Sequence, residues 1–407
     1  MNRGAVAEID LSAIAYNLRS VRKIVKNRPV IAVVKADAYG HGAVEVSKKL
    51  FEENVSFLAV AFTGEAIELR EAGIKSPIIV LFDTGYIKEI FDFKLIPVIY
   101  NVDTASSLSA EAKKKNIIIK VHVKIDTGMG RLGLSGNHIV NDLIKISEME
   151  GIELVGLLSH FSEADLSDRS YAVLQLKRFN KIRETISKIL KRKIFSHIAN
   201  SAAVLTFEDA HLDAVRPGLM LYGYSPINQK SEVSPPTHPS PARRMAGGPS
   251  RGEGEGGGED SELRTTSPEL INLMPAMKVK TKILCIRNVP SGTPISYGRT
   301  FITKRPSRIG VLPLGYADGY NRFFSNNAEV LVKGRRVPVV GRICMDLTMI
   351  DLTDVKGVKE NDEIVIMGKQ GKESITAQEL AHKATTISYE ILTSLGGKSK
   401  RIYVETH

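Results

Sequence analysis

The chain has 407 residues, a length at which one hydrophobic core usually gives way to two domains. Its hydrophobic fraction of 43% is that of a globular protein, and its two cysteines, Cys285 and Cys344, exclude a disulfide framework. Because no early apolar stretch resembles a signal peptide or a membrane span, we expect a cytoplasmic protein with no membrane contact.

The formal net charge of +11 raises the question of a nucleic-acid partner. Such a partner requires basic residues clustered on one face and interleaved with stacking aromatics. Here the lysines are scattered, as at Lys48-Lys49, and tryptophan is absent. The charge therefore indicates a solvated, lysine-rich surface and no nucleic-acid binding.

Between Ile31 and Val215, short runs rich in β-branched residues alternate with segments of helical period. The eight runs are Ile31–Val34, Phe57–Ala61, Ile78–Phe82, Ile96–Ile99, Ile117–Ile125, Leu154–Leu158, Ile194–Ile198 and Asp213–Val215. Eight strands interleaved with helices are typical of a (β/α)8 TIM-type barrel, and the span has the length that such a barrel needs. A doubly wound open α/β sheet is the alternative architecture.

The composition changes after the eighth run. Residues 230–268 are rich in proline and glycine and lack apolar anchors, which predicts a disordered insert between a barrel domain, residues 1–229, and a second domain, residues 269–407. Short strands separated by turns predict that the second domain is mainly antiparallel β, closed by two helices. The predicted strands are Lys278–Leu284, Arg308–Leu312, Glu329–Lys333, Val337–Val340 and Glu363–Met367, and the helices Ala377–Lys383 and Ser388–Leu395.

A lysine stands where the first run ends. Lys35 follows residues 30–34, which read as a strand covered on both faces. Polar residues after such a strand emerge at its carboxyl end, where the sites of α/β folds lie. A partly desolvated lysine there can attack a carbonyl group to form a Schiff base. On this segment alone, a solvated lysine that opens a loop is the commoner explanation.

Polar clusters also follow the last four runs. They are Lys124 to Arg131, Ser159-His160, Asn200-Ser201 and Arg216 to Gly218. Barrel phosphate sites commonly use the loops after strands seven and eight, and Ser201 with the amides of Gly218 and Leu219 fits that role. Each residue alone has an ordinary explanation: Ser201 as an N-cap, Gly218 as a turn glycine, His160 as a hydrogen-bonded histidine and Arg216 as a surface charge. Together with Lys35 they indicate a site for a phosphate-bearing aldehyde cofactor.

Over nearly its whole length, except the insert, the chain resembles the alanine racemases, which use pyridoxal phosphate and have a barrel and a C-terminal β domain. The motif Val34-Lys35-Ala36-Asp37-Ala38-Tyr39-Gly40-His41-Gly42 resembles the cofactor-lysine motif, and Lys124-Ile125-Asp126-Thr127-Gly128-Met129-Gly130-Arg131 resembles the second signature. In the second domain, residues 295–300, 315–319 and 341–346 resemble the stretches that carry the other base, the substrate entrance and the carboxylate site.

The resemblance implies a role for each matched residue. Lys35 and Tyr297 would be the two catalytic bases, and Lys35 would form the Schiff base with the cofactor. The residues implied to bind pyridoxal 5'-phosphate are Lys35, Tyr39, His160, Asn200, Ser201, Arg216, Gly218 and Leu219. Arg131 and Met345 would bind the substrate, with support from a carbamylated Lys124, Tyr316 and Asp346. No metal is implied.

The implied reaction interconverts L-alanine and D-alanine, which supplies D-alanine for peptidoglycan precursors. Removal of the α-proton from one face and its delivery to the other require two acid–base groups around a planar carbanion. By resemblance, Lys35 serves the D-enantiomer and Tyr297 the L-enantiomer. Since the tyrosine of the family comes from the partner subunit, a homodimer with shared active sites is implied. Racemases for other amino acids share the scaffold, so the size of the substrate stays open.

One departure from the family pattern and two alternative classes of protein remain open. Many relatives have a phosphate-contacting tyrosine soon after the helix expected at Ser388–Leu395, where this chain has residues 396–401, so Tyr403 or Ser399 would have to replace it. Barrel decarboxylases for basic amino acids share the cofactor lysine but pair the pyridine nitrogen with a carboxylate, which Arg216 disfavours. Non-enzymatic cofactor carriers share the first motif and end after the barrel.

Overall fold

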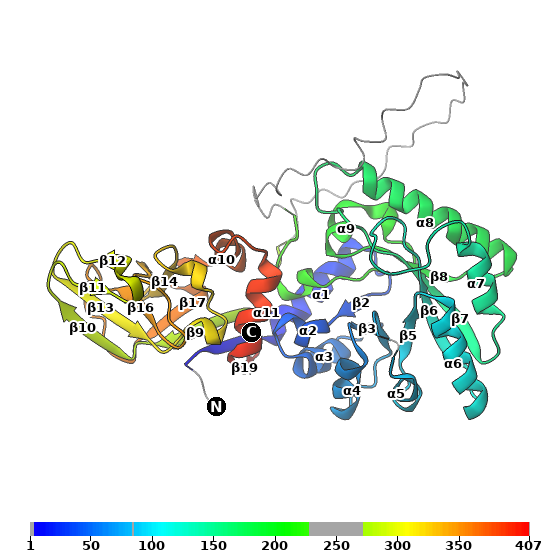
Figure 1. The fold of residues 1–407 in the computed structure, drawn as a ribbon, viewed down its shortest axis with the longest axis horizontal. Helices are drawn as coiled ribbons and strands as arrows, with labels where there is room; N and C mark the ends of the chain where they lie inside the picture. The colour runs from blue at the N-terminus through cyan, green and yellow to red at the C-terminus, as the bar shows by residue number, and fades with distance from the viewer. Residues whose placement is uncertain (1–3, 84, 228–271, 407) are drawn as a thin grey trace, which may run out of the picture.

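A computed structural model describes residues 4–83, 85–227 and 272–406. Two regions are distinct in Figure 1, a helix-covered barrel and a region of mostly antiparallel strands. The predicted insert, residues 230–268, and both predicted domain boundaries lie outside the described residues. Within the described residues, no helix is both long and apolar enough to cross a membrane.

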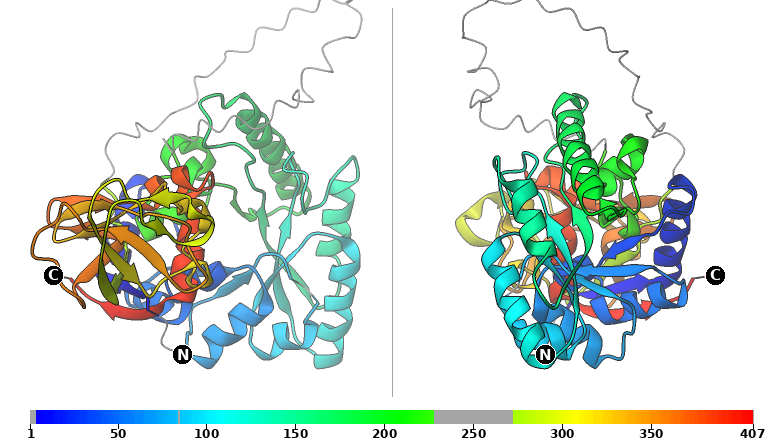
Figure 2. Two further views of the ribbon diagram at one scale, coloured as in Figure 1. Left: turned by 60° about the vertical axis from the view of Figure 1, so that its left-hand side comes forward. Right: turned by 90° about the vertical axis from the view of Figure 1, so that its right-hand side faces the viewer.

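The barrel sheet has seven parallel strands that pair in chain order. They are β2 (Ile31–Val33), β3 (Phe57–Val60), β4 (Ile78–Val80), β5 (Ile96–Ile99), β6 (Ile119–Lys124), β7 (Ile152–Leu158) and β8 (Phe195–His197). The residues of β2 and β4 are buried, as expected of parallel strands covered on both faces. The barrel predicted from the alternating pattern is therefore confirmed, and its helices lie outside the sheet (Figure 2).

The helices of the barrel region are α1 (Leu11–Ile24), α2 (Lys35–Tyr39), α3 (Ala43–Glu52), α4 (Thr63–Glu71), α5 (Ile87–Asp92), α6 (Val102–Lys115), α7 (Ile139–Ser147), α8 (Ser170–Ile189) and α9 (Ser201–Thr206). Helix α1 precedes the first barrel strand, α2 to α8 connect successive barrel strands, and α9 follows the last one. Helix α9 starts at Ser201, and the Asn200 side chain caps it by accepting a hydrogen bond from the Ala203 amide at 3.0 Å.

The eighth predicted run, Asp213–Val215, does not form a strand. Ala214 makes a single parallel bridge with His197, and Val215 makes one with Val30. These bridges connect β8 to the start of β2, so they close the barrel where the eighth strand was expected. The run is short and Pro217, which follows it closely, has no amide hydrogen to extend a ladder.

The second region contains one seven-stranded sheet and two smaller sheets. Its strands are β9 (Met277–Lys282), β10 (Cys285–Val289), β11 (Pro294–Ile295), β12 (Phe301–Ile302), β13 (Ser307–Leu312), β14 (Glu329–Val332), β15 (Arg335–Pro338), β16 (Thr348–Asp351), β17 (Glu363–Gln370), β18 (Glu373–Ile375) and β19 (Lys400–Val404). Helices α10 (Ala377–Lys383) and α11 (Ser388–Lys398) follow β18. The predicted β character of this region is confirmed.

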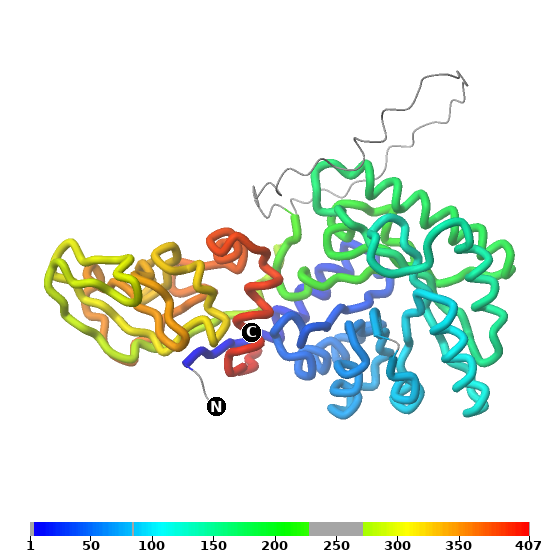
Figure 3. Tube along the Cα trace, in the orientation of Figure 1, coloured from blue at the N-terminus to red at the C-terminus, as the bar shows by residue number. Residues whose placement is uncertain are grey.

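The N-terminal strand belongs to the second region, which the sequence pattern did not indicate. β1 (Val6–Asp10) pairs with β9 in antiparallel and with β19 in parallel orientation. In Figure 3, the blue first segment and the red last segment accordingly run side by side between the two regions. The strand β19 thereby returns to the barrel beside the residues that follow β2.

Candidate active site

A cavity of about 160 Å³ lies at the carboxyl ends of the barrel strands. Ten predicted site residues line it: Lys35, Tyr39, Lys124, Arg131, His160, Asn200, Ser201, Arg216, Gly218 and Leu219. Six further residues complete the lining: Val33, Leu81, Phe82, Leu158, Ser159 and Tyr389. The clusters that follow separate strands thus converge on one cavity, because parallel strands in a barrel end at the same rim.

Lys35 opens a left-handed turn. Residues 36–39 have φ between 52° and 56°, a conformation that costs roughly 1–2 kcal/mol per non-glycine residue. The turn is held from two sides: the Glu65 carboxylate accepts a hydrogen bond from the Ala36 amide at 2.6 Å, and Asp37 forms an ion pair with Arg401 of β19. These contacts fix the direction in which Lys35 leaves the end of β2.

The cavity is cationic and poor in counter-charge. No aspartate or glutamate is among the described residues that line it. Burial, together with the positive charge of Arg131, lowers the pKa of Lys35, although Glu65 opposes the shift. Burial, followed by Arg131 and Arg216, lowers the pKa of Lys124 to about 8. Both amines therefore reach their neutral, nucleophilic form at lower pH than an ordinary lysine.

One end of the cavity presents hydroxyl groups. The phenols of Tyr39 and Tyr389 form no hydrogen bond with another described residue, and their rings lie 5.8 Å apart. Burial raises the pKa of both tyrosines, so both stay neutral donors. Ser201 Oγ accepts the Gly218 amide at 2.9 Å, which leaves its own proton free to donate. A Cβ at Gly218 would lie 2.4 Å from Tyr39 Oη, so only glycine permits this arrangement.

Tyr389 is a C-terminal tyrosine that lines the cavity and that the sequence pattern did not indicate. The tyrosine stands at the start of α11, before the segment where it was sought, and α11 reaches the cavity because Gly40 and Gly396 allow the helix to pack closely on the lysine turn. A Cβ on Gly396 would lie 2.4 Å from the Gly40 carbonyl oxygen. Tyr403 and Ser399, the suggested substitutes, do not line the cavity.

Arg216 also lines the cavity and is 5% exposed. Its guanidinium donates to His197 Nδ1 at 2.6 Å and to the carbonyl oxygens of Ser159 and His197 at 2.6 and 2.9 Å. Burial lowers the pKa of Arg216 to about 9, so the group stays charged at pH 7. Because these acceptors are neutral, Arg216 keeps its full charge for a ligand.

Arg216 contacts His197, which in turn contacts His122. Since His197 Nδ1 accepts from Arg216, its proton lies on Nε2, which is 2.9 Å from His122 Nδ1. Burial and the nearby Arg216 charge hold the pKa of both histidines well below 6.5, so both are neutral. His160 is neutral for the same reasons, and its Nδ1 is 3.4 Å from Arg216 Nη2.

The residues present fit pyridoxal phosphate. The unpartnered phenols and Ser201 supply donors for a phosphate, Lys35 supplies the amine for the aldehyde, and Arg216 supplies a donor for the pyridine nitrogen. The close approach of Tyr39 to Gly218, whose amide donates to Ser201 Oγ, places the Tyr39 phenol near the start of α9. Among the described residues there is no group of three or more His, Cys, Asp or Glu that could hold a metal ion.

Four predicted residues do not line this cavity. Tyr297, Tyr316 and Met345 line a second cavity, of about 770 Å³, in the β region, and their exposed fractions are 70%, 42% and 54%. Asp346 lines neither cavity. Ser394 and Lys398 of α11 also line the second cavity, whereas Tyr389 at the start of the same helix lines the first. Within one chain, Lys35 and Tyr297, the two bases implied by the family resemblance, therefore do not line the same cavity.

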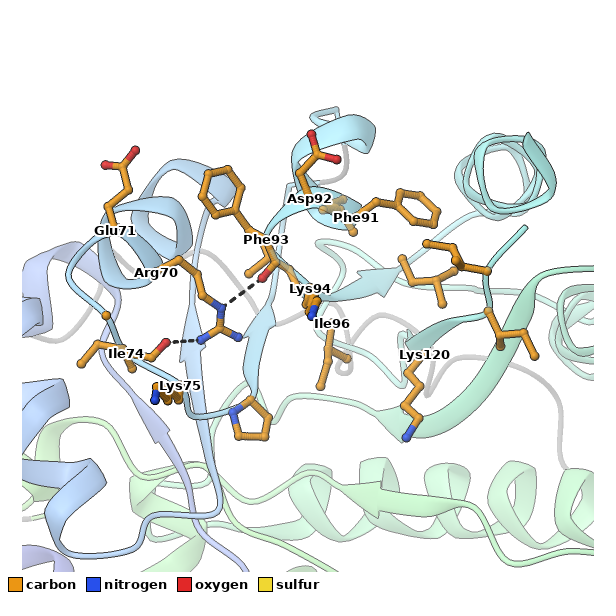
Figure 4. A pocket seen from close by; sticks show the side chains of 17 residues that line it. Arg70, Glu71, Ile74, Lys75, Phe91, Asp92, Phe93, Lys94, Ile96 and Lys120 are labelled. Atoms are coloured by element: carbon orange, nitrogen blue, oxygen red, sulfur yellow. Dashed lines mark hydrogen bonds between the residues drawn. The ribbon is translucent and has the colours of Figure 1, made fainter. Parts of the chain in front are cut away.

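A third cavity, of about 800 Å³, is the largest of these but lies away from the predicted site (Figure 4). It opens beside the amino-terminal ends of β5 and β6, at the opposite end of the barrel. The Arg70 guanidinium reaches it but donates to the carbonyl oxygens of Phe93 and Ile74, at 3.0 and 2.6 Å. None of the predicted site residues lines it, so size alone does not identify the active site.

A barrel with a half-buried lysine and a phosphate cradle at its mouth, joined to a β domain, defines a pyridoxal-phosphate enzyme that acts on amino acids. The family model for the alanine racemase N-terminal domain matches residues 9–226, and that for the alanine racemase C-terminal domain matches residues 276–403. The chain therefore belongs to the alanine racemase family, and it interconverts L-alanine and D-alanine. The general purpose of this reaction in the family is to supply D-alanine for peptidoglycan.

Individual relatives agree with this assignment. The alanine racemase of Thermodesulfovibrio yellowstonii is 46% identical over 99% of each chain. The structure of alanine racemase from Clostridium difficile 630 has a TM-score of 0.84 at 33% identity and covers 100% of this chain and 97% of its own. The structure of alanine racemase from Bartonella henselae has covalently bound pyridoxal phosphate. Its TM-score is 0.80 at 28% identity, and the match covers 98% of this chain and 99% of its own. The C-terminal match excludes a carrier that ends after the barrel.

Proposed function

We propose that Lys35 and Tyr297 are the two bases of the racemisation, with Lys35 serving the D-enantiomer and Tyr297 the L-enantiomer. When bound, pyridoxal phosphate supplies the electron sink that makes the α-proton of the amino acid removable. Lys35 acts as a base through its lowered pKa, which favours the neutral amine. The proton leaves or reaches Cα at Lys35 Nζ on one face and at Tyr297 Oη on the other.

The remaining residues of the first cavity hold the reactants. Tyr39, Tyr389, Ser201 and the Gly218 and Leu219 amides would hold the phosphate, with Asn200 fixing the start of α9. His160 would lie over the pyridine ring. Arg216, a donor that stays charged, would face the pyridine nitrogen and leave it unprotonated. A weaker electron sink shortens the life of the carbanion, which favours reprotonation at Cα over side reactions.

Arg131 and Lys124 form the substrate-carboxylate side of the proposed site. Arg131 would bind the carboxylate, with Met345, Tyr316 and Asp346 of the second cavity region completing that side in the assembled enzyme. Lys124 would react as a neutral amine with CO2 to give a carbamate and one released proton. The carbamate would supply the negative charge that the described lining of the cavity lacks, and it would orient Arg131.

The pKa of Lys124 leads to a testable pH dependence. A fall from 10.5 to about 8 increases the neutral fraction at pH 7 by roughly 300-fold. We therefore expect carbamate occupancy to rise between pH 7 and pH 9 and to fall when CO2 is removed. Carbon-13 NMR of holoenzyme supplied with labelled bicarbonate should show one signal that Lys124→Ala abolishes and that Lys120→Ala, at an exposed lysine of the same strand, retains. A signal unchanged in Lys124→Ala would contradict the assignment.

The proposal includes a homodimer with shared active sites, and the separation of the two cavities supports it. Tyr297 is 70% exposed and lines a cavity other than that of Lys35, which supports a second base supplied by another copy of the chain. Sedimentation of the holoenzyme should give twice the 44.6 kDa of one chain. A stable, active monomer would overturn this arrangement.

The proposal includes the domain division and the compartment. We assign residues 1–229 to the barrel domain and 269–407 to the β domain, with β1 crossing to the sheet of the latter. A cytoplasmic location is supported by Cys285 and Cys344, which are both free thiols, as is usual in a reducing compartment.

A further inference from the structure

Three cationic side chains surround the ring of Phe82. Its centroid lies 5.3 Å from Lys35 Nζ, 5.4 Å from Lys124 Nζ and 5.6 Å from Arg131 Cζ. All three distances are within the range of about 6 Å at which a cation is attracted to the negative face of an aromatic ring. Phe82 lines the same cavity and was not singled out in the sequence, where it simply ends an apolar run.

Contacts of the loop that follows β4 fix the position of Phe82. The Phe82 amide donates to the Ala61 carbonyl oxygen at 3.0 Å, and the neighbouring Asp83 carboxylate accepts from the Thr63 amide at 3.2 Å. The ring of Phe62 makes an edge contact at 6.4 Å with an interplanar angle of 68°. These contacts fix Phe82 to the start of α4, so the ring is a defined surface within the cavity.

Arg131 depends most on this ring. Its guanidinium forms no hydrogen bond or ion pair with another described residue, and no described carboxylate lines the cavity. Lys35 no longer carries a free ammonium group when it bonds to the cofactor, and Lys124 loses its positive charge if it becomes a carbamate. Arg131 is the one of the three whose charge persists through both events.

We propose that Phe82 is a positioning residue whose ring face holds the Arg131 guanidinium where it binds the substrate carboxylate. This inference rests on the proposed role of Arg131. The ring places the cation without neutralising it, so the full charge of Arg131 stays available to the substrate. A carbamate on Lys124 would then act from a second direction, and the two contacts would define the orientation together.

The test is graded fluorination of the Phe82 ring in the holoenzyme. Phenylalanine with one, two or three ring fluorines keeps nearly the same shape while the negative face weakens, and Phe82→Leu removes the ring but keeps an apolar side chain. The readouts are the inhibition constant of propionate, a carboxylate that cannot be racemised, and the KM for L-alanine. We expect both to rise stepwise with fluorine number and about fivefold in Phe82→Leu, with kcat changed less than about twofold.

Two control variants make the outcome decisive. Phe51→Leu, the same change at an exposed site of α3, should leave both constants unchanged. Phe82→Leu should have no further effect in an Arg131→Ala background, since the contact is already lost. If Arg131→Ala raises the propionate constant but the fluorinated series does not, Phe82 does not position Arg131 through its ring. If Arg131→Ala leaves that constant unchanged, the proposed carboxylate role of Arg131 is wrong and the inference falls with it.

Discussion

Replacement of Lys35 by alanine is expected to lower kcat for racemisation in either direction by at least about 10³-fold. The variant loses both the amine that bonds to the cofactor and one of the two proposed bases. The cavity otherwise keeps its lining, so pyridoxal phosphate should still bind without a covalent bond. Borohydride treatment followed by peptide mass analysis should find the cofactor attached to Lys35 in the unaltered chain and to no peptide in the variant.

A small primary amine provides the second part of this test. Methylamine fits the space that the Lys35 side chain leaves and should restore part of the activity, with a pH dependence that follows the pKa of the added amine. Lys120→Ala, which removes an exposed lysine of β6, is the matched control and should be fully active. Retention of more than a tenth of the activity in Lys35→Ala would show that another group carries the role.

Replacement of Tyr297 by phenylalanine is expected to lower kcat by about 10²- to 10⁴-fold, the usual contribution of a general acid–base group. The ring remains, so the exposed turn that carries Tyr297 should keep its structure, and cofactor binding in the first cavity should not change. The measurement is the rate of α-hydrogen exchange with deuterated water for each enantiomer. L-alanine should lose exchange much more than D-alanine, because Tyr297 is proposed to serve the L-enantiomer.

Mixing of the two inactive variants tests the shared site. A heterodimer of Lys35→Ala and Tyr297→Phe chains has one site with both intact bases if Tyr297 acts in trans, and none if it acts in cis. Random exchange of equal amounts should therefore restore about a quarter of the unaltered activity per site. Confirmed subunit exchange without recovery would contradict the shared site.

The first cavity could be predicted largely from the sequence because its residues follow parallel strands. Lys35, Lys124, His160 and Ser201 come after different strands, and a barrel brings the ends of those strands to one rim. The prediction of an eighth strand was wrong, because Asp213–Val215 forms only two isolated bridges. A run of three residues does not indicate whether it forms a strand or single bridges. The parallel pairing of β1 with β19 was not visible, since it joins two segments almost four hundred residues apart.

Tyr389 and Phe82 could not be predicted for a different reason. Tyr389 reaches the cavity through the packing of α11 on the lysine turn, a contact between the two regions that has no local sequence signal. Phe82 belongs to no catalytic motif, and its proposed role depends on three cations from two distant segments of the chain, at the ends of β2 and β6. The proposed role of Tyr297 depends on the association of two copies of the chain, which the structure of a single chain does not contain.

The measurement that tests the account most directly is the conversion of L-alanine by the purified protein with added pyridoxal phosphate, followed by chiral chromatography. We predict that D-alanine accumulates until the two enantiomers are equal, and that in deuterated water the D-alanine formed carries deuterium at Cα. Bound, borohydride-reducible cofactor without any D-alanine would contradict the assignment of this site to racemisation.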